Sequence, residues 1–329
     1  MRLQILVPVY NEGFEVVKPL LDSIAIQQNV DFKEVGVIIC NDGGKPMQWT
    51  HNFINYYDNF YPFEIQYYDE PHRGVSGTRN ACLDKATAEY VMFCDCDDMF
   101  LNACGLWILF REMAVGFDSL VSTFTEETRI PQTGEVIYIN RDIDSTFVHG
   151  KVHRRQYLID QNIRWNEKLT IHEDSYFNCL CQKLSTNVKF CPTPFYLWKW
   201  RDASVCRHDP KYILKTYNNM LDSNTALVKQ FLQRDRRSDA EFFATNMIYD
   251  AYYTLNKKEW IDQENQEYRA NVEKRFREYY KEFKSLFESV SEAVKAQIIM
   301  GQKNRFFQEG LLMEHITFDD WIKHIENDD

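Results

Sequence analysis

The sequence has no hydrophobic stretch long enough to cross a membrane. A membrane-spanning helix needs about 18 or more consecutive apolar residues, and no run within the 329 residues approaches that length. Met1 leads within two residues into the strand-like LQILVPV, which leaves no room for a cleaved signal peptide. We therefore expect a cytoplasmic protein without a transmembrane segment.

Several short motifs that define other protein classes are also missing. Neither GxxxxGK[ST] nor GxGxxG occurs, which argues against a P-loop NTPase and against a dinucleotide-binding protein. The nine cysteines form no CxxC pair and lie mostly in apolar stretches, which is typical of buried reduced thiols rather than of a zinc or disulfide framework. The formal net charge of −11 disfavours a polyanion-binding surface over the whole molecule.

The first hundred residues alternate between two kinds of segment. Stretches with helical spacing separate four short apolar or β-rich runs, which are LQILVPV, VGVIIC, FEIQYYD and YVMFCD. This alternation predicts βαβ units on a mostly parallel sheet flanked by helices. Polar residues follow each run, and ligands of such sheets bind at the carboxyl ends of the strands. We therefore expect four strand ends to converge on one ligand-binding edge.

The rest of the chain divides into two parts. From residue 118, the strand-like SLVSTFTEE and EVIYINR precede the helical segments VHRRQYLIDQN and HEDSYFNCLCQKL, and we expect them to extend the sheet and form one side of a cleft. From 209 to 329 the pattern is almost wholly helical. The sequence thus predicts an α/β domain over 1–208, with halves 1–100 and 101–208, and a helical C-terminal domain over 209–329. The pattern does not distinguish acceptor recognition from self-association into a homo-oligomer as the role of that domain.

Three aspartates crowd the end of the fourth run, in EYVMFCDCDDMF (89–100). In an extended chain Asp95 and Asp97 project to one face, and the neighbouring cysteines project to the other. Two carboxylates on one face can chelate a hard divalent cation, which offsets their charge. The alternative is that DCDD is a plain polar turn after a strand, where Asp is common.

Four motifs, in order and with typical spacing, resemble those of family 2 glycosyltransferases of the GT-A fold. They are VPVYNE (7–12), NDGG (41–44), GVSGTRNACLDKATAEYVMFCDCDD (74–98) and HEDSYF (172–177). The resemblance implies a GT-A type, Rossmann-like sheet, mixed but mostly parallel and flanked by helices. It also implies an enzyme that transfers a sugar, with inversion, from a nucleotide-diphosphate donor to an acceptor hydroxyl, with a UDP-sugar as the expected donor.

The resemblance assigns roles to individual residues. It makes residues 1–100 the nucleotide-binding half of the catalytic domain and residues 101–208 the acceptor half. Around the nucleotide sugar it places Pro8, Val9, Tyr10, Glu12, Asp42, Arg79, Asp95, Cys96, Arg201, Ser204 and Arg207. Asp42 would accept a hydrogen bond from the uracil ring, and Asp95 would contact the ribose. A cofactor ion, Mn²⁺ or Mg²⁺, would be held by Asp97, Asp98 and His208.

Asp174 is the general base that the resemblance implies. In this family the Asp of the Glu-Asp pair takes the proton from the acceptor hydroxyl, and Glu173 would orient the acceptor. The alternative is that both carboxylates are plain N-terminal charges or caps of a helix. One base without a covalent intermediate predicts inversion at the anomeric carbon.

The sequence leaves the acceptor open. A surface polysaccharide or teichoic-type glycan is the commonest acceptor in the family that the motifs resemble. A hydroxymethylated DNA base is an alternative, which the pI of about 5.3 disfavours. A further alternative is a non-catalytic sugar-binding module on a GT-A scaffold, and the intact Asp95, Asp97 and Asp174 argue against it.

Overall fold

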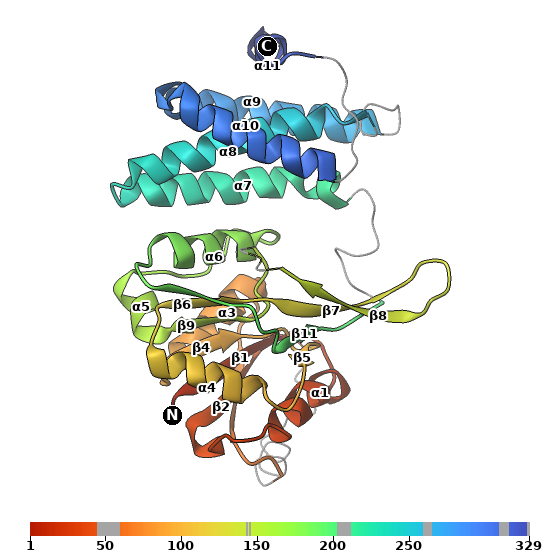
Figure 1. Cartoon of the computed structure of the whole chain (residues 1–329), viewed down its shortest axis with the longest axis vertical. Helices are drawn as coiled ribbons and strands as arrows, with labels where there is room; N and C mark the ends of the chain where they lie inside the picture. Colours follow the sequence, from red (N-terminus) through yellow and green to blue (C-terminus); the bar gives the residue numbers. More distant parts are fainter. Residues whose placement is uncertain are drawn as a thin grey trace. The chain divides into compact units, whose positions relative to one another are not determined.

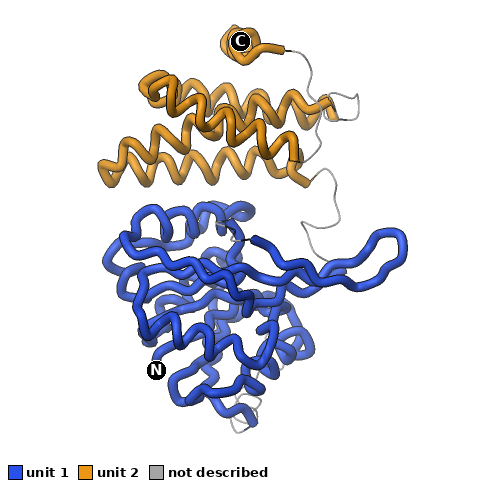
Figure 2. Tube along the Cα trace, viewed as in Figure 1, with its two compact units in different colours: residues 1–204 blue, residues 205–329 orange. Residues whose placement is uncertain are grey.

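The computed structural model describes residues 1–44, 60–142, 144, 146–202, 212–258, 265–308 and 316–327. The chain divides into two compact units, residues 1–204 and residues 205–329 (Figure 2). The first unit combines strands with helices, and the second is helical (Figure 1). The predicted α/β fold followed by a helical C-terminal region is confirmed. The boundary predicted after residue 208 falls outside the described residues.

The strands all belong to the first unit. They are β1 (Leu3–Val9), β2 (Val35–Asp42), β3 (Glu64–Glu70), β4 (Tyr90–Phe93), β5 (Met99–Phe100), β6 (Ser119–Ser122), β7 (Phe124–Arg129), β8 (Val136–Arg141), β9 (Lys151–Arg154), β10 (Val188–Cys191) and β11 (Tyr196–Trp198). The helices of this unit are α1 (Phe14–Ala25), the short 3₁₀ helix η1 (Phe32–Glu34), α3 (Gly74–Lys85), α4 (Gly105–Val115), α5 (Arg155–Asp160) and α6 (Glu173–Lys183). Those of the second unit are α7 (Tyr212–Gln233), α8 (Arg237–Leu255), α9 (Gln266–Ser289), α10 (Glu292–Gln308) and α11 (Phe318–Asn327).

A seven-stranded sheet forms the centre of the first unit. Its order is β10-β6-β9-β4-β1-β2-β3, in which β9 runs antiparallel to both neighbours and the other pairs are parallel. A second sheet has the order β5-β11-β7-β8. In the large sheet Val9 is level with Asn41, and Asp42 is level with Glu70. The ends of β1, β2 and β3 therefore meet at one edge, as the sequence predicts.

Apolar side chains cover both faces of the large sheet and make its edge rigid. Leu3, Ile5 and Val7 of β1 belong to one core cluster together with buried residues of α1 and α4. On the opposite face, the ring of Phe93 packs edge-on against Phe177 of α6, with their centroids 5.5 Å apart. Burying each such side chain contributes about 1.5–3 kcal/mol. The polar strand ends thus belong to a sheet that is well packed on both faces.

Pro8 is compatible with a central strand because the pairing of β1 with β4 ends before it. The backbone N–H of Cys94 donates to the carbonyl of Leu6, so the even-numbered residues of β1 turn their backbone groups toward β4. The pairing with β4 stops at Leu6 and Phe93. Pro8, which has no N–H to donate, is the next even-numbered residue and lies just past that ladder.

The helix predicted over VHRRQYLIDQN begins later than the pattern suggests. Residues Lys151–Arg154 form β9, which inserts between β4 and β6, and α5 begins at Arg155. The sequence KVHR carries a single aliphatic side chain and therefore gives no strand signal. Its polar groups are satisfied inside the sheet, where the Nδ1 atom of the buried His153 lies 3.0 Å from the hydroxyl of Ser119.

The cysteines follow the prediction in part. Six of the eight described cysteines are buried, and all eight are free thiols. Cys104 is exposed and Cys179 is half-buried, so the expectation of burial is wrong for Cys104. Cys206 falls outside the described residues. Within the described ranges, no helix has both the length and the apolar character needed to cross a membrane.

The second unit is held by a buried polar network as well as by apolar packing. The hydroxyl of Tyr217 donates to Asp250 Oδ2 at 2.7 Å, and Arg305 Nη1 lies 2.7 Å from Asp250 Oδ1. These contacts join α7, α8 and α10. Because a partner lost from a buried network is costly, such contacts fix one arrangement of the helices.

Candidate active site

Asp95, Asp97 and Asp98 lie in a turn rather than in an extended chain. β4 ends two residues before Asp95, and the N–H of Asp98 donates to the carbonyl of Asp95 at 3.1 Å. The expectation that the first two carboxylates alternate along a strand is therefore wrong. The turn gives each carboxylate a different partner, and it leaves an oxygen of Asp95 within 4.8 Å of an oxygen of Asp98.

Arg79 of α3 offsets much of this negative charge. Its side chain is 5% exposed, and its Nη2 and Nη1 atoms lie 2.9 Å from Asp95 Oδ1 and from Glu173 Oε1. The guanidinium carbon lies 4.4 Å from the ring centroid of Trp165, within the range of a cation–π contact. One buried cation thus joins the turn after β4 to the first residue of α6.

The ion pairs of Arg79 determine the protonation states of Arg79 and of Asp95. Burial by itself lowers the pKa of Arg79, but the charges of Asp95 and Glu173 outweigh it and raise the pKa above the usual value. Burial likewise acts to raise the pKa of Asp95, and Arg79 holds it below the usual value instead. Near neutral pH the guanidinium and the Asp95 carboxylate are therefore both charged.

Asp97 lies on the accessible side of the turn. Arg201 Nη1 lies 3.1 Å from Asp97 Oδ2 and 3.5 Å from Glu12 Oε1, so one guanidinium bridges the ends of β1 and β4. Burial and the neighbouring Asp95 raise the pKa of Asp97, and the hydrogen bond from Arg201 opposes them. Cys96, next to Asp97 in the turn, is buried.

Asp98 points into the protein and is 1% exposed. The hydroxyl of Tyr196 donates to its Oδ2 atom, and the N–H of Lys199 donates to its Oδ1 atom at 3.0 Å. Burial, together with Asp95, raises the pKa of Asp98 well above the usual value. The second sheet, through β11, thereby anchors the turn from behind.

His149 lies beside the same carboxylate. Its Nδ1 atom is 3.5 Å from Asp98 Oδ2 and, in the part of the chain that the structure describes, has no hydrogen-bond partner. Burial lowers the pKa of His149 to about 3, so the imidazole is neutral and its nitrogen can act as a metal ligand. Asp95, Asp98 and His149 each offer one ligand atom, and these atoms lie within 4.8 Å of one another.

Asp174 occupies the first turn of α6, directly after the residue bound by Arg79. The helix begins at Glu173, and the preceding His172 has a left-handed backbone with φ 61°. The N–H of Ser175 donates to Asp174 Oδ1 at 2.8 Å. Burial raises the pKa of Asp174 to about 7, with Glu173 adding to the rise and Arg79 opposing it. A carboxyl group with that pKa is suited to general-base catalysis near neutral pH.

A second polar group surrounds Asp42 at the end of β2. Its Oδ1 atom accepts the N–H of Arg73 at 2.7 Å, and its Oδ2 atom lies 3.0 Å from Nδ1 of His72. The rings of Tyr10 and His72 lie 4.9 Å apart. Gly43 has φ 68°, and a Cβ atom there would lie 2.5 Å from the backbone nitrogen of His72, so only glycine allows this close approach.

The structure brings most of the predicted residues to one edge of the sheet. Pro8 and Val9 end β1, and Asp42 ends β2, level with the third strand. Ser204, Arg207 and His208 fall outside the described residues, so their roles stay predictions. Sequence reasoning missed His72, Arg73, Trp165 and Tyr196. The polar PHRG directly after the third strand was the one local signal for the first two.

Comparison with known proteins points to one family. Residues 4–125 match the sequence model of Glycosyl transferase family 2. The poly(ribitol-phosphate) beta-N-acetylglucosaminyltransferase TarS of Staphylococcus aureus (strain Mu50) is 25% identical over 189 residues, which are 54% of this chain and 32% of TarS. The minor teichoic acid biosynthesis protein GgaB of Bacillus subtilis (strain 168) is 26% identical over 189 residues, which are 52% of this chain and 20% of GgaB. The chain spans a third or less of the length of these relatives.

Solved structures agree in fold. A crystal structure of S. aureus TarS 1-349 in complex with UDP-GlcNAc has a TM-score of 0.61 at 16% identity, over 94% of this chain and 92% of that one. The mannosyltransferase PcManGT from Pyrobaculum calidifontis, in complex with GDP-Man and Mn²⁺, has a TM-score of 0.51 at 12% identity, over 99% and 84%. The fold is of the GT-A type. In sequence over residues 4–125, and in fold over most of its length, the chain is similar to the family 2 glycosyltransferases.

Proposed function

We propose that this enzyme is an inverting glycosyltransferase that moves a sugar from a UDP-sugar to a hydroxyl group of a glycan. The observation that carries the proposal is the bridge made by Arg79 between Asp95 and Glu173, with both distances 2.9 Å. The bridge links the turn on the donor side to the residue before Asp174. A base suited to neutral pH is thereby tied to the edge where a nucleotide sugar binds in sheets of this kind.

The contacts around Asp42 support the proposal of a uracil nucleotide. Its carboxylate is held by Arg73 and His72, which leaves it an acceptor suited to the N3–H of a uracil ring. Tyr10 and His72 offer aromatic faces for a base to stack on. The TarS structure contains UDP-GlcNAc, which makes this sugar nucleotide the first donor to test.

A teichoic-type glycan is the acceptor that we favour. The names of TarS and GgaB both refer to polymers of this kind, and each relative is about as similar to this chain as the other. The match covers a minor part of each relative, so the acceptor of this enzyme needs its own test.

The residues present fit a divalent cation, Mn²⁺ or Mg²⁺. The turn supplies three carboxylates, which are the ligands that such hard ions prefer. His149 adds a neutral buried nitrogen that has no hydrogen-bond partner among the described residues. We infer that the ion would be held at this turn by Asp97 together with the group of Asp95, Asp98 and His149, whose ligand atoms lie within 4.8 Å of one another. When bound, the ion supplies Lewis-acid stabilisation of the charge that builds on the departing diphosphate.

In this proposal, side chains of the chain bind the donor and activate the acceptor. Asp174 accepts the proton of the acceptor hydroxyl as that oxygen attacks the anomeric carbon from the face opposite the nucleotide. Glu173, held by Arg79, orients the acceptor. Arg201, which bridges Asp97 and Glu12, offers charge-assisted hydrogen bonds to the diphosphate oxygens.

Replacing Asp97 with Asn should lower kcat about 10²–10³-fold, because several kcal/mol of charge stabilisation depend on the bound ion. The expected loss is read from UDP release during a Mn²⁺ titration, in parallel with a thermal unfolding curve that should hardly move. The exposed Asp160→Asn on α5 is the control for removing one carboxylate. Full activity of Asp97→Asn, or of the wild type in excess chelator, would count against the metal site.

The rate of transfer should rise with pH and level off above pH 7. Burial raises the pKa of Asp174 to about 7, and the base acts only as a carboxylate, so kcat/KM should fall about tenfold per pH unit below that value. Because Glu173 adds to the raised pKa, Glu173→Gln should shift the profile to lower pH. Initial rates between about pH 5 and pH 9 test both statements, and a profile that is level across this range would rule out Asp174 as the base.

A panel of nucleotide sugars tests the proposed function as a whole. Purified enzyme is incubated with UDP-GlcNAc, UDP-glucose, UDP-galactose and GDP-mannose, with Mn²⁺ or with a chelator, and product masses are measured on poly(ribitol phosphate) and on hydroxymethylated DNA. We expect metal-dependent transfer from a UDP-sugar to the glycan. Binding of UDP without turnover on any acceptor would favour a non-catalytic sugar-binding module.

A further inference from the structure

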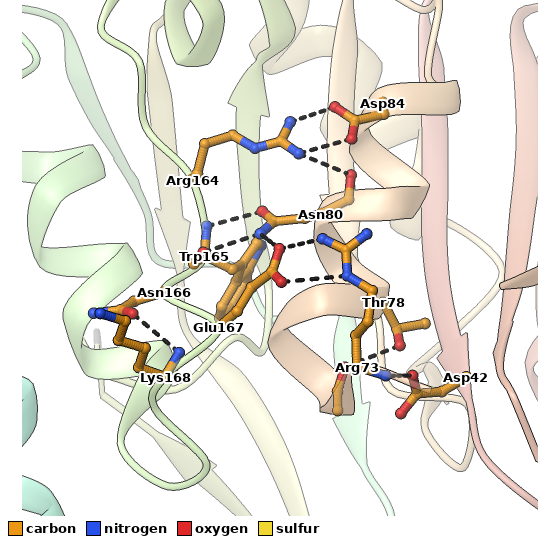
Figure 3. Close-up of polar contacts among 11 residues, drawn as sticks. Asp42, Arg73, Thr78, Asn80, Asp84, Arg164, Trp165, Asn166, Glu167 and Lys168 are labelled. Atoms are coloured by element: carbon orange, nitrogen blue, oxygen red, sulfur yellow. Dashed lines mark hydrogen bonds and ion pairs between the residues drawn. The ribbon is translucent and has the colours of Figure 1, made fainter. Parts of the chain in front are cut away.

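Polar contacts join α3 and the residue before it to residues 164–167, in the segment that leads into α6 (Figure 3). Glu167 lies at their centre. Arg73 approaches it through two nitrogens, with Nε 3.2 Å from Oε2 and Nη2 bonded to Oε1. The side-chain amide of Asn80 donates to the same carboxylate at 3.0 Å. This carboxylate thus accepts three hydrogen bonds, two from the residue just before α3 and one from the middle of that helix.

Asn80 also fixes the neighbouring Trp165. The N–H of Trp165 donates to Asn80 Oδ1, and Asn80 Nδ2 donates to the carbonyl of Trp165, each at 3.0 Å (Figure 3). The indole lies under the guanidinium of Arg79 on one side and stacks on Phe177 of α6, with centroids 4.1 Å apart. Asn80 therefore binds Glu167 and also fixes the residue whose indole ring contacts Arg79.

The other end of this network reaches Asp42, the proposed uracil acceptor. The backbone N–H of Arg73 donates to Asp42 Oδ1, while its side chain holds Glu167 (Figure 3). A continuous series of contacts therefore runs from the proposed uracil acceptor, through Arg73 and Glu167, to the segment that ends at α6. The acceptor base Asp174 stands at the start of that helix.

We propose that Glu167 is a positioning residue for sugar transfer, which sets the Asp174 carboxyl at the correct distance from a nucleotide bound at Asp42. The inference rests on the proposed function and adds a residue to it. Among the described residues, the side-chain hydrogen bonds of Glu167 go to Arg73 and Asn80, so it acts through the segment that it holds. A displacement of about 1 Å at a reacting group can cost about 10²-fold in rate.

The chain offers a matched control in the pair of Arg164 and Asp84. It joins the same segment to the same helix, with Nη2 2.8 Å from Oδ2 (Figure 3). The exposures are similar, at 42% and 39% for Arg73 and Glu167 and 40% and 57% for Arg164 and Asp84. Exposed pairs of this kind contribute about 0–1 kcal/mol to stability. Within the described structure, the control pair makes no hydrogen bond to the Asp42 carboxylate.

The test compares Glu167→Gln with Asp84→Asn, each of which removes one charge and keeps the shape of the side chain. For Glu167→Gln we expect kcat with UDP-GlcNAc to fall about 10–100-fold, while KM for the donor and the Kd of UDP change less than about threefold. Asp84→Asn should leave all three constants within about threefold. The two variants should unfold at similar temperatures, and titration with UDP gives the fraction of folded sites for each.

Each outcome bears on the inference. Equal kcat for Glu167→Gln and Asp84→Asn would overturn it, whether both match the wild type or both lose activity. A fall in kcat that disappears after correction for the folded fraction would reduce Glu167 to a structural role. A wild type that neither binds UDP nor transfers sugar would instead overturn the proposed function, and the positioning role with it.

Discussion

Replacing Asp174 with Asn should lower kcat for sugar transfer by about 10²–10⁴-fold, because an amide cannot take the proton of the acceptor hydroxyl. The affinity for UDP should stay within about threefold, since the proposed role of Asp174 is toward the acceptor. The measurement is steady-state kinetics with saturating donor and Mn²⁺, together with UDP binding by calorimetry.

The stability of the same variant separates the base from the alternative of a helix cap. Burial raises the folded-state pKa of Asp174 to about 7, above the value of an unfolded Asp. A group shifted in this direction adds stability below its unfolded pKa and loses that contribution as the pH rises through its folded pKa. At about pH 8, Asp174→Asn should therefore be as stable as the wild type or more so. A variant that keeps activity but loses stability would indicate that Asp174 is a helix cap.

Replacing Arg79 with Met should destabilise the first unit by about 3–5 kcal/mol. The substitution leaves Asp95 and Glu173 without their buried cation, and breaking a buried pair on one side carries a cost of this size. This is a large part of the roughly 5–15 kcal/mol that stabilises a typical domain. Arg79→Lys should also lose stability, because a single ammonium cannot hold both carboxylates in the planar arrangement of the guanidinium.

Chemical denaturation at two pH values tests the electrostatic origin of this loss. Arg79 holds the pKa of Asp95 below its usual value, so its contribution is present at neutral pH and fades as the pH falls through that lowered pKa. In Arg79→Met, burial is no longer opposed by the guanidinium and should raise the pKa of Asp95, so the variant loses its unpaired charge by protonation as the pH falls. The gap between wild type and Arg79→Met should therefore be larger at about pH 7 than at about pH 4. Arg164→Met, which removes an exposed guanidinium, should cost about 1 kcal/mol or less. Equal losses at both positions would contradict the buried bridge.

The sequence predicts the large sheet well because its signals are local and strong. Each of the first four strands is an apolar or β-rich run that ends in polar residues, so both the strands and their shared edge follow from the pattern. β9 could not be predicted in this way. Three of the four side chains in KVHR are polar, His153 among them, so the sequence gives no sign that this strand is buried. The turn at Asp95 to Asp98 was also missed, since alternation along a strand assumes that the strand continues.

The residues that support the site are harder to predict than the residues that form it. Asp95, Arg79 and Asp174 stand in short motifs with a recognisable spacing. Arg73 and Glu167 meet across 94 positions of sequence, and each by itself is an ordinary charged residue in a loop or at a helix start. No local pattern reveals such a contact, because it exists only after the sheet has brought the two segments together.

A crystal structure of the enzyme with UDP-GlcNAc and Mn²⁺ is the most direct test of the central claim. It should show uracil bonded to Asp42, the ion between Asp97 and the diphosphate, and the Asp174 carboxyl across one sugar ring from the nucleotide, on the face opposite the leaving group. A nucleotide bound at another place, or an Asp174 side chain too far for one hexose to reach both it and the ion, would contradict the claim.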